Sequence, residues 1–195
     1  MGVVDSILAE RGNNIFVISS DMVPELKVDQ SLAHNGVCLT VEKLLVAEKK
    51  YQVTAINETL EKTMLGDLKK GERINLERSL LSNGRVDGHF VQGHVDTCGT
   101  ILEIKELEGS WEYFVKYPPE FESLVVNQGS IALNGISLTI ARSLPAQHVI
   151  SVCIIPYTSV HTNIGDWQVG NRINIEFDVL GKYVKKILST GSLAQ

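Results

Sequence analysis

The stretch that decides the fold is SLAHNGVCLTV at residues 31–41, because it returns as SIALNGISLTI at residues 130–140. A second pair, ETLEKTMLGDLKKGERINLE at 58–77 and YTSVHTNIGDWQVGNRINIE at 157–176, has the same offset of 99 residues. A constant offset over two blocks indicates two copies of one folding unit rather than chance reuse of a short motif. Each copy spans about 90 to 100 residues, which is the size of a small domain.

The composition is that of an ordinary globular protein. Of the 195 residues, 44% are hydrophobic and 21% are charged, which is not typical of disorder. The net charge of −5 argues against nucleic acid as the main partner, because phosphate binding needs a basic surface. The first residues, MGVVDSILAERGNN, have no signal-peptide pattern, and no run approaches the roughly 18 apolar residues of a membrane span. We therefore expect a cytoplasmic protein with a small-molecule partner.

The cysteines and histidines favour neither a disulfide nor a metal site. Cys38, Cys98 and Cys153 are odd in number and contain no CxxC pair, which fits reduced thiols. His89 and His94 could be mistaken for metal ligands, but no further Cys or His stands at ligand spacing. We expect no metal, and we interpret His89 as structural and His94 as a hydrogen-bonding or acid–base group.

Short segments rich in β-branched residues alternate with turn signals in both copies, which is typical of strands. The first copy has IFVIS, VCLTVEKLLVA, YQVTAI and RINLE, and the second has EYFVKY, SIAL, ISLTIARSL, HVISVCII and RINIEFD. The Asn-Gly pairs at 35–36 and 134–135 stand between such runs, where they supply the positive φ of a tight hairpin turn. The pattern predicts two small antiparallel β-barrels.

Three helical stretches are expected beside the strands. Residues 22–27 and 118–125 combine an early proline with apolar residues at helical spacing. The tail at 179–191 forms an apolar stripe flanked by lysines, made of Val179, Leu180, Tyr183, Val184 and Ile187. Such a stripe needs a cover, either from the chain's own barrels or from other copies of the chain, and the sequence leaves both open.

Duplicated polar residues mark a candidate ligand-binding face. Cys38 alternates with Thr40 as Ser137 alternates with Thr139, so the polar pair of each copy shares one face of a strand. A row of small polar groups suits a ligand with hydroxyl and amide-like edges. A merely solvated strand face would have the same pattern, and spacing alone favours that simpler interpretation.

The blocks SLAHNGVCLTV, LGDLKKGERINLE, GHFVQGHVD, GSIALNGISLTI and NIEFD followed by GKYV together resemble riboflavin synthases of the heavy-subunit type and their lumazine-binding relatives. The resemblance covers essentially the whole chain in the family's order. It implies an all-β fold of two tandem, similar six-stranded Greek-key barrels and a C-terminal helix. The barrels would span residues 1–88 and 89–178, and the helix and tail at 179–195 would gather three chains into a trimer.

The resemblance also implies a reaction. Each barrel would bind one 6,7-dimethyl-8-ribityllumazine, and the active site would lie between the N-terminal barrel of one chain and the C-terminal barrel of its neighbour. One molecule would donate a four-carbon unit to the other, giving riboflavin and 5-amino-6-ribitylaminouracil without a cofactor. Lumazine synthase is a further expected partner. The alternative is a non-catalytic lumazine- or flavin-binding protein, against which the polar residues retained in both copies argue.

Residue roles carried over from the family fall on both copies. Ser31, Cys38 and His94 would supply the catalytic polar groups of the N-terminal site and the barrel junction, and Asp178 those of the C-terminal site. Cys38 could instead be a small buried hydrophobe, and Asp178 could cap the terminal helix. The expected substrate-binding positions are Cys38, Leu39, Thr40, Thr54, Ala55, Ile56, Asn57, Glu58, Thr59, Gly93, His94, Val95, Gln128, Ser137, Leu138, Thr139, Cys153, Ile154, Ile155, Pro156, Tyr157 and Thr158.

The two copies differ at their starts. Residues 2–7 align with residues 99–104 at an offset of 97, so that only Met1 stands opposite residues 89–98, HFVQGHVDTC. If residues 89–98 form the first strand of the second barrel, the first barrel lacks about nine residues of strand. An open barrel exposes unpaired edges that invite strand addition. We therefore expect the chain as given to be weakened in catalysis and to self-associate in an altered way.

Overall fold

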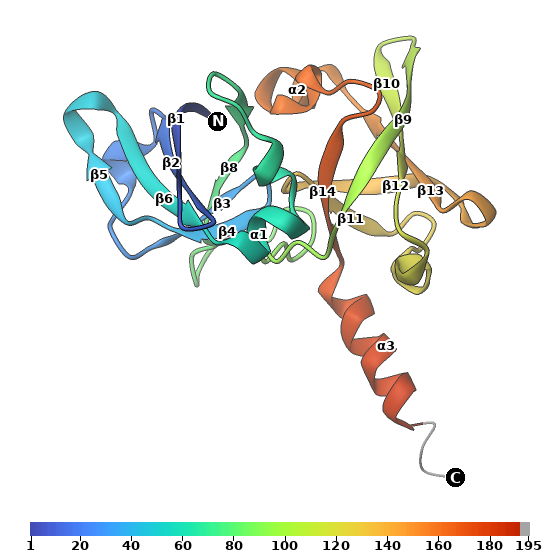
Figure 1. Ribbon diagram of the computed structural model, residues 1–195. Helices are drawn as coiled ribbons and strands as arrows, with labels where there is room; N and C mark the ends of the chain where they lie inside the picture. Colours follow the sequence, from blue (N-terminus) through green and yellow to red (C-terminus); the bar gives the residue numbers. More distant parts are fainter. Residues whose placement is uncertain (192–195) are drawn as a thin grey trace.

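The computed structural model describes residues 1–191 as two β-rich halves, from which one helix projects away (Figure 1). The first half contains β1 (Gly2–Glu10), β2 (Asn13–Ser19), β3 (Ser31–His34), β4 (Val37–Thr40), β5 (Lys43–Leu45), β6 (Lys50–Ala55), α1 (Asn57–Lys62), β7 (Arg73–Ile74) and β8 (Leu76–Arg78). The second half contains β9 (Thr97–Leu107), β10 (Ser110–Lys116), β11 (Ser130–Leu133), β12 (Ile136–Leu144), β13 (Val149–Ile154), α2 (Pro156–His161) and β14 (Arg172–Phe177), and α3 (Val179–Gly191) follows. Short 3-10 helices lie at Val23–Glu25, Val46–Glu48, Met64–Asp67, Pro119–Leu124, Pro145–Gln147 and Asn163–Asp166.

The second half is a closed antiparallel barrel with the strand order β10, β13, β12, β11, β14 and β9. Its strands alternate side chains between the inside and the outside, as the period of two requires. Apolar residues from every strand meet inside as one buried cluster, which includes Ile101, Val115, Ile131, Ile140, Val152 and Ile175. This cluster is the core that holds the second candidate site in shape.

The first half has the same strand order, but two of its strands are interrupted. Its sheets are β5-β6-β2-β1-β7 and β4-β3-β8. By the repeat offset, β4 and β5 correspond to β12, and β7 and β8 correspond to β14. Pairing continues at one break, where the Glu42 N–H donates to Gln52 O at 2.9 Å. The all-β fold of two similar barrels with a terminal helix is therefore confirmed, with continuous strands all round only in the second half.

The expected turns and helices form as the sequence indicates. Asn35 and Gly36 have φ values of 46° and 77°, and Asn134 and Gly135 have 46° and 78°. Both hairpins therefore have the paired positive φ of a type I′ turn. The stretches at 22–27 and 118–125 contain 3-10 helices, and α3 covers the tail. The sequence interpretation missed α1 and α2, because six-residue helices show too few turns for a periodic pattern.

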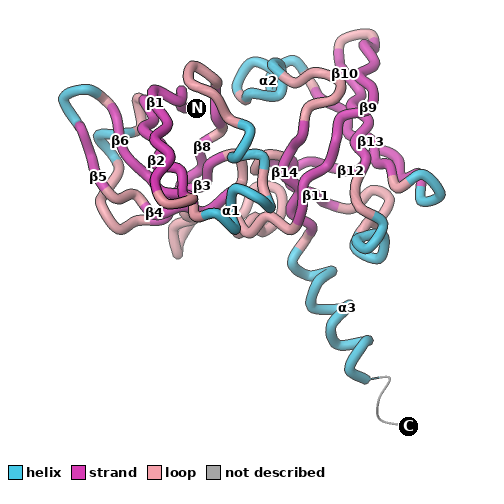
Figure 2. The backbone as a smooth tube through the Cα atoms, viewed as in Figure 1, coloured by secondary structure: helices cyan, strands magenta, loops and turns pink. Residues whose placement is uncertain are grey.

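The structure corrects the expectation of a strand at residues 89–98. Residues 89–96 have no strand, and β9 begins only at Thr97, so that the chain enters the second barrel as a loop (Figure 2). In the first half, β1 pairs with β2 and β7 just as β9 pairs with β10 and β14. The expectation that the first barrel lacks its first strand is thus wrong, because β1 holds that place. The second half differs by the irregular segment at 89–96.

A pseudo-two-fold network of asparagines joins the halves at the two hairpin turns. The Asn75 N–H donates to Asn35 Oδ1 and the Asn174 N–H donates to Asn134 Oδ1, both at 2.8 Å. Each strand asparagine also crosses to the other half. Asn75 Nδ2 donates to Asn134 O at 3.2 Å, and Asn174 Nδ2 donates to Asn35 O at 2.8 Å. The repeated sequence thus forms both the barrels and the contact between them.

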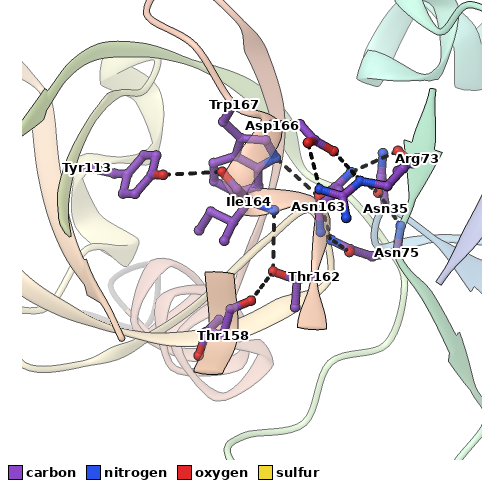
Figure 3. Close-up of polar contacts among 10 residues, drawn as sticks. All are labelled: Asn35, Arg73, Asn75, Tyr113, Thr158, Thr162, Asn163, Ile164, Asp166 and Trp167. Carbon is purple, nitrogen blue, oxygen red and sulfur yellow. Dashed lines mark hydrogen bonds and ion pairs between the residues drawn. The ribbon is translucent and has the colours of Figure 1, made fainter. Parts of the chain in front are cut away.

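Asn163 breaks this symmetry from the second half. Its Nδ2 donates to Asn35 Oδ1 at 3.1 Å, and its Oδ1 accepts from Trp167 Nε1 at 3.2 Å. Beside it, Arg73 makes a two-pronged ion pair with Asp166, with both N–O distances at 2.6 Å (Figure 3). Asn163 is buried, and both its amide nitrogen and its amide oxygen are hydrogen-bonded, which fixes one relative placement of the two halves.

Candidate functional site

Two polar strand faces, one on each half, carry most of the expected site residues. On β4, Val37 and Leu39 are buried, whereas Cys38 is half-buried and Thr40 is exposed. Cys38 and Thr40 therefore share the outer face as predicted, and Leu39 belongs to the core and offers only its backbone. Ser31 pairs with Thr40 across the β3–β4 register, which extends the polar face to a third strand position.

The loop before β9 completes this face from the other half of the sequence. The Cys38 N–H donates to Gly93 O at 2.8 Å. A β-carbon on Gly93, whose φ is +80°, would lie 2.8 Å from Cys38 Cβ, so that only glycine allows this approach. His94 follows on the exposed surface, and Val95 packs against the first core. The structure thus brings Cys38 and residues 93–95 together.

The other expected N-terminal positions follow β6 into α1. Thr54 Oγ1 donates to Glu42 Oε2 at 2.9 Å on the outer face, whereas Ala55 is fully buried in the core. The chain then leaves the sheet, and the Asn57 N–H donates to Asn13 Oδ1 at 3.2 Å. The start of α1 is mostly exposed and contains Ile56, Asn57, Glu58 and Thr59.

The second polar face lies on β12 and β13. Ser137 is half-buried and Thr139 is exposed, and Thr139 pairs with Ser130. Cys153 is exposed, and it pairs with Glu112 of β10 in the strand register. The positions that follow lead into α2 as in the first half, with Ile154 in the core and Ile155, Pro156 and Tyr157 exposed and Thr158 half-buried.

Three further expected residues have structural roles. Asp178 caps α3, because its Oδ1 accepts from the Leu180 N–H at 3.0 Å; it remains half-buried at the base of the helix. Gln128 has φ +63° in the turn before β11, where its N–H donates to Ile140 O at 3.1 Å. Leu138 packs against the second core.

A cavity of about 770 Å³ lies at the junction of the halves and brings residues of both faces together. It is lined by Ser31, Cys38, Gly93 and Ser137, and by the connecting segment at 79–91. His89 reaches into this region, where its Nδ1 lies 2.7 Å from Ser137 Oγ. Burial lowers the pKa of His89, so that the neutral ring prevails at neutral pH. His89, interpreted as structural, is therefore a direct neighbour of a candidate site residue.

Two buried carboxylates were missed by the sequence interpretation. Glu112, beside Cys153, accepts from Ser151 Oγ at 2.7 Å and lies 3.3 Å from Arg142 Nε. Glu176 accepts backbone N–H groups of the loop that carries His94. The only signal in the sequence for Glu176 is its repetition as Glu77 in NLE and NIE. Among residues 1–191, no three His, Cys, Asp or Glu side chains gather as metal ligands would.

Residues 1–79 and 92–178 both match the lumazine binding domain family. The chain belongs to this lumazine-binding family. It is 35% identical over 174 residues to the riboflavin synthase of Actinobacillus pleuropneumoniae, covering 89% of this chain and 79% of that protein. It is 36% identical over 169 residues to the riboflavin synthase of Bacillus subtilis (strain 168), and the match covers 87% of this chain and 77% of that protein. The riboflavin synthase of Mycobacterium tuberculosis (strain H37Rv) is 40% identical over 160 residues, covering 81% and 79%.

Solved structures of LumP share the fold. The structure of LumP complexed with 6,7-dimethyl-8-(1'-D-ribityl) lumazine matches with a TM-score of 0.80 and 20% identity, over 90% of this chain and 93% of that chain. LumP complexed with riboflavin matches with a TM-score of 0.82 and 21% identity, over 90% of this chain and 94% of that chain. At this identity the likeness establishes the double-barrel fold alone. No helix among residues 1–191 has the length and apolar character needed to cross a membrane.

Proposed function

We propose that the chain is a riboflavin synthase, which converts two 6,7-dimethyl-8-ribityllumazine molecules into riboflavin and 5-amino-6-ribitylaminouracil by transfer of a four-carbon unit. The observation that carries this proposal is the identity of 35 to 40% to three riboflavin synthases over more than four fifths of the chain. The doubled polar face supports it physically. A reaction between two identical molecules needs two similar binding surfaces, and this chain has one on each half.

The active site forms between two chains. The N-terminal face of one chain and the C-terminal face of its neighbour would hold the two heterocycles against each other. Such positioning turns a bimolecular encounter into an effectively intramolecular one and supplies much of the rate enhancement.

The two faces have different chemistry, which suits a donor and an acceptor. Cys38 has Ser137 as its repeat partner, and Asp178 has Ser79. Cys38, Ser31 and His94 would serve the N-terminal site and the barrel junction. The reaction needs a nucleophile that adds to the ring of the donor molecule and a base that removes a proton from the acidic 7-methyl group. Asp178 and the backbone groups near Thr139 would serve the C-terminal site. Because delocalisation makes the methyl group acidic, a weak base suffices.

The expected assembly is a homotrimer held by α3. Its apolar side chains are strongly exposed in the single chain, namely Leu180, Tyr183, Val184, Ile187 and Leu188. An apolar stripe of this kind is stable only when another surface covers it. Association of the trimer with lumazine synthase, and a cytoplasmic location that suits the three free thiols, complete the proposal. The boundaries at residues 88 and 178 also remain predictions.

Mixing the purified chain with 6,7-dimethyl-8-ribityllumazine tests the activity. Growth of the riboflavin absorption band with equimolar 5-amino-6-ribitylaminouracil supports the proposal. A shift in lumazine fluorescence without turnover, at substrate concentrations that saturate both barrels, would replace it with the non-catalytic binding protein. Absence of both binding and turnover by the trimer would reject both functions.

A further inference from the structure

The carboxylate of Glu176 on β14 is buried, with 2% of the residue exposed, and it holds three consecutive peptide groups. Oε1 accepts from the Gln92 N–H at 2.8 Å, and Oε2 accepts from the Gly93 and His94 N–H groups, both at 3.0 Å. A carboxylate is an acceptor on both oxygens, and hydrogen bonds of this charge-assisted kind are stronger than neutral ones. The loop at 92–94 is therefore fixed to the second barrel.

The same loop reaches the first barrel. Gly93 donates its N–H to Glu176 and accepts the Cys38 N–H on its carbonyl oxygen at 2.8 Å. Further on, Asp96 is also held by β14, since the Phe177 N–H donates to its Oδ2 at 2.9 Å. A continuous path of hydrogen bonds thus runs from β14 of the second half, through the loop, to the β4 face of the first half.

The repeat provides an internal comparison. Glu77 occupies the same register on β8, where it pairs with Ala33 as Glu176 pairs with Ala132. Glu77 is nevertheless exposed. A glutamate at this register can therefore be exposed to solvent. In the second half the loop at 92–94 crosses over the glutamate, and there the side chain is buried. Gly93 of this loop is hydrogen-bonded to Cys38. A change at Glu176 would therefore alter the surroundings of a residue in the other barrel.

We propose that Glu176 is a positioning residue for the N-terminal substrate site, although it belongs to the C-terminal barrel. It fixes the Gly93 carbonyl against Cys38 and holds the backbone N–H of His94 next to it. The catalytic part of this inference rests on the riboflavin synthase activity proposed above. The structural part, control of the Cys38 environment from β14, is independent of any activity.

Glu176→Gln tests the inference, because glutamine keeps the size but replaces one acceptor oxygen by an NH₂ donor that faces a backbone N–H. We expect alkylation of Cys38 by iodoacetamide, followed by peptide mass spectrometry, to accelerate about tenfold while that of Cys153 stays unchanged. In the riboflavin assay, kcat should fall between about 10- and 100-fold, the range for small displacements of catalytic groups. Glu106→Gln, which removes an exposed carboxylate from β9 outside the cavity, is the control and should leave both thiol rates at their wild-type values.

Gly93→Ala provides a second test that leaves β14 intact, since its β-carbon would displace the loop at Cys38. The same selective acceleration of Cys38 supports the inference. Equal acceleration of Cys38 and Cys153 in Glu176→Gln, together with a lower unfolding temperature, would overturn it in favour of a general stabilising role. Unchanged Cys38 reactivity in both variants would also overturn it. If the wild-type chain forms no riboflavin, the proposed function fails, whereas the thiol result still decides the positioning role.

Discussion

Asn35 and Asn134 show how one residue can serve two levels of structure. From the sequence, each is fully explained by the positive φ of its hairpin turn. In the structure, each side chain also accepts the N–H of a strand asparagine, at 2.8 Å in both halves, and each carbonyl accepts an amide from the opposite half. Each asparagine therefore serves the contact between the halves as well as the turn, through its Oδ1 and its backbone carbonyl, and Asn35 Nδ2 also donates to Met64 Sδ at 3.3 Å.

The buried pair of His34 and Tyr51 makes the first half sensitive to acid. His34 is fully buried. Its Nδ1 lies 2.9 Å from Leu32 O, and its Nε2 lies 2.8 Å from the Tyr51 hydroxyl oxygen. Burial lowers the pKa of His34 to about 4 from 6.5. The unfolded chain binds this proton below about pH 6.5 and the folded chain only below about pH 4. The contribution of His34 to the free energy of unfolding is therefore fully present above pH 6.5, and it is lost as the pH falls from 6.5 to about 4.

We expect the free energy of unfolding to decrease by about 2 kcal/mol between pH 7 and pH 5 through His34 alone. Denaturant titrations of the chain at both values measure the change. The double variant His34→Leu with Tyr51→Ile is the control, because the second half has Leu133 and Ile150 at these positions. An equal acid loss in wild type and double variant would show that other groups are responsible.

Cys38→Ser makes the two polar faces alike, because serine is the repeat partner of Cys38. If the thiol supplies chemistry that a hydroxyl cannot, riboflavin formation at saturating lumazine should fall by about 10²-fold or more, with little change in stability. Cys98→Ser is the matched control, since Cys98 is half-buried, donates to Lys62 O and lies outside the candidate site. Turnover of Cys38→Ser at the wild-type rate would remove the thiol from the proposed mechanism.

At the element scale, sequence periodicity predicted the strands and missed what interrupts or joins them. The alternation of Cys38 with Thr40 follows from local pattern, and so does the turn at 35–36. The loop at 89–96 depends on contacts with distant residues, as the hydrogen bond from the Cys38 N–H to Gly93 O illustrates. No local pattern encodes a hydrogen bond between positions 55 residues apart. For the same reason the burial of Glu176 was not predictable, although its repetition as Glu77 was visible.

The two hairpin turns touch, and glycine makes that contact possible. A β-carbon on Gly36, whose φ is +77°, would lie 2.7 Å from the Gly135 backbone nitrogen. Gly36→Ala should therefore cost about 1 kcal/mol for the positive φ and at least as much again for separating the halves. Gly71→Ala isolates the first contribution, because Gly71 has φ +90° and a methyl group there would meet no atom within 4 Å. Equal unfolding temperatures for Gly36→Ala and Gly71→Ala would contradict a tight contact between the turns.

At the scale of the molecule, the repeat organises the junction as a pseudo-dimer. Arg73 pairs with Asp166 at 2.6 Å, and the equivalent Arg172 pairs with Asp67 at 2.8 Å. All four side chains are substantially exposed, so that these ion pairs add orientation more than stability. The buried asparagines supply the rigid part of the junction. A fixed junction holds Cys38 and Ser137, one residue from each polar face, in the wall of one cavity.

The terminal helix decides whether neighbouring chains can meet. Ile187, 66% exposed on the apolar stripe of α3, would be covered in a trimer. Ile187→Glu places a charge in that apolar contact, where it is costly without a partner, and should yield single chains in sedimentation velocity. Riboflavin formation should fall with the trimer, whereas lumazine binding to each barrel should persist, because α3 leaves the barrels (Figure 1). Lys186→Glu alters charge on the polar side and should remain trimeric. Full turnover by a monomeric Ile187→Glu chain would refute an active site shared between chains.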